Sequence, residues 1–182
     1  MKLNKIELLA NLEAEVNEQI LTVIDHYQNA PGSILSRPAS NGGWSVIQCL
    51  EHLNSYGDYY LPQISAALKK ADKDGSQIYT SGWLGDYFTK IMSPETGTKK
   101  HKAFKGHIPP ANLDPEKVVS EFLRQERLLL EYLKQASNHD LSVRIPISIS
   151  KWINLKLGDI LRFVIAHNRR HVLQAQRSSN SR

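Results

Sequence analysis

The chain has 182 residues, of which 41% are hydrophobic and 23% charged, with one cysteine and ten glycines. This composition is typical of a compact globular chain, and it excludes gross disorder, a collagen-like chain and a disulfide scaffold. We expect a single domain over residues 1–182. The formal net charge of +5 favours anionic partners without identifying one.

The sequence carries no signal for crossing or entering a membrane. Its longest apolar run, residues 163–166, is far shorter than the roughly 20 residues that a membrane span requires. The N-terminal residues lack the apolar core of a signal peptide. Together with a lone cysteine, Cys49, these features predict a cytoplasmic protein.

Four segments have the periodicity of amphipathic helices. Apolar residues recur at steps of three and four over residues 5–27, beginning with Ile6 and preceded by a capping Asn4. Ser45 and Gln48 form a capping box that begins a helix reaching to about residue 70. Asp114, followed by proline, begins the third helix, and residues 156–177 form the fourth. The expected fold is all-α, a four-helix bundle.

Two connections are more elaborate than a minimal bundle needs. Residues 71–113 form a long connection between the second and third helices, with one short helix at residues 83–92 and a basic, turn-rich stretch at residues 98–110. A connection of that length is usually functional or mobile. Residues 143–149 alternate between apolar and other side chains around Pro146, which predicts extended chain or a short edge strand.

The fourth helix contains two histidines, His167 and His171, four residues apart and therefore on one face. Both continue the apolar stripe of Ile160 and Val164, which should point into the bundle. Two buried neighbouring imidazoles are unfavourable unless they are hydrogen-bonded or bind a metal. The spacing alone leaves both alternatives open.

A catalytic metal site requires a third protein ligand from another element. His52, early in the second helix, is the candidate. Ligand imidazoles must be deprotonated, so metal occupancy should fall below about pH 6. The remaining histidines are expected to be solvated side chains; they are His26, His101, His107 and His139.

Several neighbouring side chains have two possible roles. Gln48 caps its helix or orients a ligand or water, and Gln174 is a candidate for the same orienting role. Cys49 is a small core residue, a fourth ligand or a redox thiol. Tyr56 and Tyr60 belong to the core or direct a hydroxyl toward the metal cavity.

Two stretches together resemble a known family. W-S-V-I-Q-C-L-E-H-L at residues 44–53 and H-N-R-R-H-V-L-Q at residues 167–174 resemble the DinB-like superfamily, in particular its YfiT-type metal-dependent proteins. The resemblance implies a four-helix bundle, often a homodimer, that holds one divalent metal ion on His52, His167 and His171. Nickel and zinc are the metals it implies first, with iron and manganese as alternatives.

The resemblance implies two reaction classes, a hydrolase and a transferase that uses a low-molecular-weight thiol, each with a small-molecule substrate. A third alternative is a metal-binding or stress-response protein without catalysis. The sequence offers no general base comparable to the glutamate of H-E-x-x-H, since Glu51 adjoins His52 and should point away from it. The basic stretch carries only one aromatic residue, which argues against nucleic-acid binding.

Overall fold

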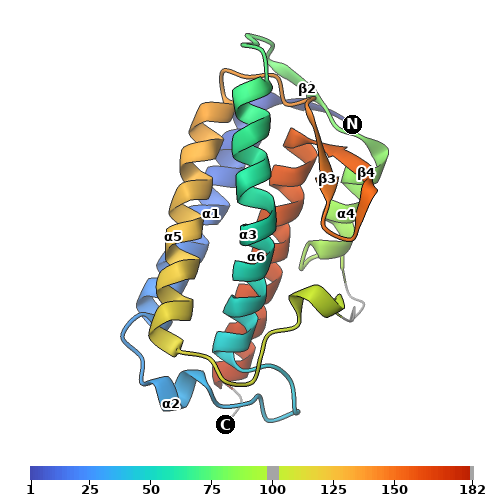
Figure 1. Ribbon diagram of the computed structural model, residues 1–182. Coiled ribbons are helices and arrows are strands. Elements are labelled where there is room, and N and C mark those ends of the chain that lie inside the picture. Colours follow the sequence, from blue (N-terminus) through green and yellow to red (C-terminus); the bar gives the residue numbers. More distant parts are fainter. Residues whose placement is uncertain (98–102, 181–182) are drawn as a thin grey trace.

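The computed structural model describes residues 1–97 and 103–180 and is mostly helical. Its four long helices are α1 (Lys5–Tyr27), α3 (Val46–Lys70), α5 (Pro115–Ala136) and α6 (Leu157–Asn180). They lie side by side, with α3 and α1 each packed against both α5 and α6 (Figure 1). Among the described residues, no helix combines the length and apolar character that a membrane crossing needs.

Capping side chains fix where the long helices begin. The Asn4 side chain accepts hydrogen bonds from the backbone N–H groups of Ile6 and Glu7. The capping box at Ser45 is complete, because the serine hydroxyl and the Gln48 side chain each bond the other residue's backbone N–H. Asp114 accepts from the backbone N–H of Lys117. Each cap satisfies donors that the first helical turn leaves unpaired.

Short elements surround these helices. The short helix expected at residues 83–92 is confirmed as α4 (Trp83–Met92), which packs against α6. Two others are α2 (Gly32–Leu35) and the 3-10 helix η1 (Lys105–His107), which contacts α3. The basic residues 98–102 lie outside the described part of the chain.

The expectation of an all-α chain needs a correction, because two small antiparallel sheets are present. The first pairs β1 (Lys2–Asn4) with β2 (Ile78–Thr80), and the second pairs β3 (Arg144–Ile147) with β4 (Ser150–Lys156). The strand β3 confirms the extended chain that was expected at residues 143–149. Its alternating side chains bury Ile145 and Ile147. The strand β4 was missed. The β3–β4 hairpin and α4 lie together on one side of the helices (Figure 1).

The core is continuous between the long helices, and most residues of the expected α1 stripe are buried in it. They are Leu9, Leu12, Val16, Ile20, Val23 and Tyr27. Ile6 belonged to the same stripe but is 59% exposed. It lies in the first turn of α1, beyond the end of the buried stripe.

Gly57 marks a close approach between α3 and α5. A Cβ atom at this position would lie 1.8 Å from the Gln125 side-chain oxygen. The Gln125 amide is buried, and its two hydrogens are shared among three nearby acceptors, the Asn54 carbonyl and the carboxylates of Asp58 and Glu121. A methyl group at position 57 must therefore displace an amide that binds three acceptors.

We expect Gly57→Ala to lower the free energy of unfolding by about 1–3 kcal/mol, the usual range for overpacking or for a lost buried hydrogen bond. Urea denaturation measures this change. Gly75→Ala is the matched control, because nothing lies within 4 Å of the added Cβ atom there. Equal stability of the two variants would contradict the prediction.

Candidate metal centre

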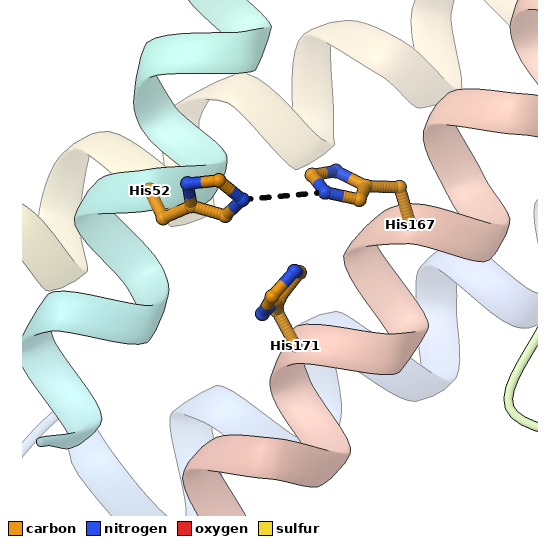
Figure 2. Close-up of side chains that lie close together, drawn as sticks. All are labelled: His52, His167 and His171. Atoms are coloured by element: carbon orange, nitrogen blue, oxygen red, sulfur yellow. Dashed lines mark hydrogen bonds between the residues drawn. The ribbon is translucent and has the colours of Figure 1, made fainter. Parts of the chain in front are cut away.

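His52, His167 and His171 converge between α3 and α6. The two helices run in opposite directions (Figure 1), so the beginning of α3 lies beside the second half of α6. His52 lies in the second turn of α3, and His171 lies nine residues before the end of α6. One nitrogen from each ring lies within 4.8 Å of the others (Figure 2).

Burial keeps all three imidazoles neutral. His52 and His167 are 2% and 3% exposed, and His171 is partly buried. Desolvation lowers the pKa of His52 to about 4 and that of His171 to about 3. Desolvation, reinforced by the neighbouring rings, also holds the pKa of His167 well below its ordinary value. Neutral imidazoles are the form that binds a metal.

A backbone carbonyl fixes the tautomer of His52. Its Nδ1 lies 2.6 Å from the His107 carbonyl oxygen. Since a carbonyl oxygen only accepts, Nδ1 carries the hydrogen and the lone pair lies on Nε2. That Nε2 faces the Nε2 of His167 at 3.3 Å (Figure 2).

The expectation that His107 is a solvated loop residue is wrong. Its Nδ1 lies 2.9 Å from the Ser55 hydroxyl, and its ring stacks on Tyr56 at 3.9 Å between centroids. These contacts hold η1 against α3, where the His107 carbonyl reaches His52. The long connection thus contributes to the histidine cluster, a role that the sequence pattern did not reveal. His26 is exposed as expected, His139 is partly exposed, and His101 lies outside the described residues.

Gln174 orients His171. The Nδ1 of His171 lies 2.9 Å from the Gln174 side-chain oxygen, so Nδ1–H donates and the Nε2 lone pair stays available. An acceptor of this kind fixes the ring orientation and raises the basicity of a ligand imidazole.

If these histidines bind a metal, Gln174→Leu is expected to weaken zinc affinity by roughly 10- to 100-fold, as for other groups that orient ligand histidines. Gln174→Glu retains an acceptor and should restore most of the loss. Competition with a chromogenic zinc chelator measures both. An unchanged affinity in Gln174→Leu would show that the hydrogen bond does not support binding.

The ring nitrogens of His167 lack adequate protein partners. Its Nδ1 is buried without a hydrogen bond. If Nε2–H donates to His52, Nδ1 keeps an unpaired lone pair; if Nδ1 carries the hydrogen, two lone pairs face each other across 3.3 Å. In the second case a divalent cation between the rings would accept the facing Nε2 lone pairs of His52 and His167, so the three imidazoles fit a metal ion.

Aromatic rings surround the cluster. The Trp44 ring lies 4.9 Å from that of His52, the Tyr56 ring 4.4 Å from that of His167, and Phe163 stacks on His167 at 5.9 Å. Burial raises the pKa of Tyr56 to about 12, so it remains a neutral phenol. The rings limit the access of water to the imidazoles.

The other candidate side chains have structural contacts. Gln48 binds the backbone N–H of Ser45 as a cap. Cys49 is fully buried, its pKa is raised to about 12 by desolvation, and it does not join the histidine cluster. The Tyr60 hydroxyl accepts from the backbone N–H of Ser148. Among the described residues, no acidic side chain joins the cluster either.

The fold and cluster define a helical protein with a buried three-histidine centre. The family model described as the DinB superfamily matches residues 18–175, which include all three histidines and both stretches that carried the resemblance. The chain therefore belongs to the DinB superfamily. Searches of curated proteins and of solved structures found no match.

Proposed function

We propose that His52, His167 and His171 hold one divalent metal ion in a DinB/YfiT-type four-helix bundle, and that the protein is a metal-dependent transferase acting with a low-molecular-weight thiol. The observation that carries the metal site is the pair of acceptors, the His107 carbonyl and Gln174, which leave Nε2 of His52 and of His171 unprotonated. Zinc and nickel suit three imidazoles, and iron or manganese are further possibilities.

A bound divalent ion would lower the pKa of a coordinated thiol or water and polarise a substrate. Within the described part of the chain, no acidic side chain joins the cluster, which favours the thiol over water. A thiol has an ordinary pKa of about 8.5, far below that of water, so a coordinated thiol would need less help from a protein base to lose its proton than a coordinated water would. His52, His167 and His171 would hold the ion, and a thiolate beside it would form a bond to an electrophilic carbon of a small-molecule substrate, with the leaving group departing with its electron pair.

The proposal is tested with protein purified without a histidine tag. Elemental analysis should give one divalent metal per chain. A panel of low-molecular-weight thiols and alkylating electrophiles should give thioether product that is lost on chelation and restored by zinc or nickel. Ester or amide cleavage without thiol would indicate a hydrolase instead, and tight metal binding without turnover would indicate a non-catalytic metal-binding protein. Light scattering tests the homodimer that belongs to this proposal.

The low pKa values change the expected pH dependence of metal binding. If a ligand histidine had a pKa near 6.5, its protonation at pH 5 would lower the metal affinity of the site by roughly 30-fold. Because the pKa of His52 is about 4 and that of His171 about 3, protons compete with the metal only below those values. The loss of occupancy is thus expected below pH 5, not below pH 6.

We expect the zinc dissociation constant to change by less than about tenfold between pH 7 and pH 5, on the same reasoning. Chelator competition at several pH values measures it, with circular dichroism to verify that the chain stays folded. A loss of three or more orders of magnitude over this interval would contradict the lowered pKa values.

A further inference from the structure

We propose that the apolar pocket beside the histidine cluster binds a short, uncharged alkyl group of the substrate. This inference rests on the proposed function, because it places the reacting end of that substrate at the metal. It adds a substrate class that neither the family membership nor the three histidines define.

The pocket lies among five parts of the chain, most of them distant in sequence. Helices α3, α4 and α6 supply aromatic walls, and the β3–β4 hairpin and the segment before η1 close the other sides. Lining side chains include Tyr56, Tyr60, Phe88, Phe104, Leu155 and Phe163.

Two pocket walls also contact the histidine cluster. Tyr56 and Phe163 line the pocket, and their rings lie 4.4 Å and 5.9 Å from the ring of His167. Phe163 stacks nearly parallel to His167, with 10° between the ring planes. A substrate with its polar end at His167 thus has an apolar surface directly beside that end.

The pocket offers nothing that would compensate a charge. Among the described residues, no acidic or basic side chain lines it. The Tyr60 hydroxyl, one of its few polar groups, already accepts from the backbone N–H of Ser148. A charged or strongly hydrogen-bonding group would lose its hydration there without a replacement partner, whereas an alkyl group gains from leaving water.

The size of the pocket limits the alkyl group. Its volume is about 50 Å³, compared with ~150 Å³ for an apolar protein cavity that binds benzene. A chain of two to three carbons fits this space, and an aromatic ring does not. Phe104, which is 53% exposed, forms part of the outer wall.

A homologous series of hydroxamic acids tests the proposal, because the hydroxamate head binds zinc and the chain samples the pocket. The zinc-loaded protein is titrated by calorimetry with acetohydroxamic, propionohydroxamic, butyrohydroxamic, hexanohydroxamic and benzohydroxamic acid. The affinity should rise about fourfold with each added methylene up to butyrohydroxamic acid, because burying one methylene group increases an affinity by about that factor. The gain beyond that length should be less than twofold in total. Affinity that is independent of chain length, or strongest for benzohydroxamic acid, would overturn the proposal.

Two variants and one control test whether the chain-length effect arises in this pocket. Ser148→Phe adds a ring to the lining and should abolish the gain per methylene, whereas Ser142→Phe adds the same ring at an exposed position and should retain it. Phe104→Ala removes an exposed outer wall with little risk to folding and should reduce the gain of the last methylene. If both Ser148→Phe and Phe104→Ala keep the full gain in affinity per methylene, the proposal is overturned. If Ser148→Phe does not fold, the result with Phe104→Ala decides alone.

Measuring the zinc stoichiometry and titrating with n-propanol distinguish a failure of the alkyl pocket from a failure of the proposed metal site. Zinc binding with no dependence on chain length overturns only the alkyl pocket. Absence of zinc binding overturns both this inference and the proposed function. Titration of the metal-free protein with n-propanol then reports on the pocket itself: shifts of Tyr56 and Phe163 resonances would show an apolar pocket that does not serve a metal, and their absence would show that it takes no alkyl group.

Discussion

Alanine in place of His52, His167 or His171 is expected to weaken zinc or nickel affinity by roughly 1000-fold each, because one of three ligands is lost. Zinc sites contribute on the order of 10–16 kcal/mol in small domains, so one ligand in three accounts for several kcal/mol. His52→Ala is the most informative variant, since His52 lies on a different helix from the other two histidines.

Elemental analysis and chelator competition measure these losses. The helical fold should survive, because the continuous apolar core extends through all four long helices and a chain of this length needs no metal to fold. His26→Ala, an exposed histidine on α1, is the matched control and should retain full affinity. Undiminished metal content in any one of the three cluster variants would remove that residue from the site.

The local signals in the sequence were sufficient to predict the four long helices and α4, but not the short α2 and η1. Caps at Asn4, Ser45 and Asp114 and the three-and-four spacing define where the long helices lie, because each signal acts within one or two turns. The same spacing places His167 and His171 on the inward face of α6. His52 could be proposed as their partner, but the level at which it meets them depends on the opposite directions of α3 and α6, which no local signal encodes.

The tertiary contributions were missed for the same reason. The His107 carbonyl that orients His52 comes from a loop whose path is set by stacking on Tyr56 and by Ser55. Strand β4 carries no sustained alternation of its own and depends on pairing with β3. Such contacts join residues that are distant in sequence and have no recurring spacing.

Glu126 is an acidic residue whose position on its helix, and not its residue type, predicts that it is buried. It lies four residues after Phe122 and three before Leu129, on the buried stripe of α5, and is 2% exposed. Desolvation raises its pKa to about 8, although Asn168 donates a hydrogen bond to it. The second carboxyl oxygen of Glu126 and the side-chain oxygen of Asn168 are both buried without partners.

Protonation explains this pair. A neutral carboxylic acid avoids the cost of a buried charge and carries a donor on its second oxygen, while its first oxygen still accepts from the Asn168 amide. Between the ordinary pKa of about 4.5 and the folded value of about 8, the folded chain holds a proton that the unfolded chain releases. Stability must therefore fall as pH rises through this interval, by about 1.4 kcal/mol per pH unit.

Glu126→Gln is expected to raise the free energy of unfolding by about 3 kcal/mol at pH 7, on this linkage argument. The glutamine amide replaces the protonated oxygen as a donor, and nothing is left to ionise. The stability advantage should shrink toward zero near pH 4.5, where the glutamate is protonated in both states. Urea denaturation from pH 4.5 to 8 measures the difference, and the exposed Glu131→Gln on the same helix serves as the control.

Because Asn168 follows His167 in α6, zinc affinity should stay unchanged in Glu126→Gln if the pair has a purely structural role. A variant less stable than the parent chain at pH 7 would show that Glu126 is ionised in the fold and that its charge is stabilised there.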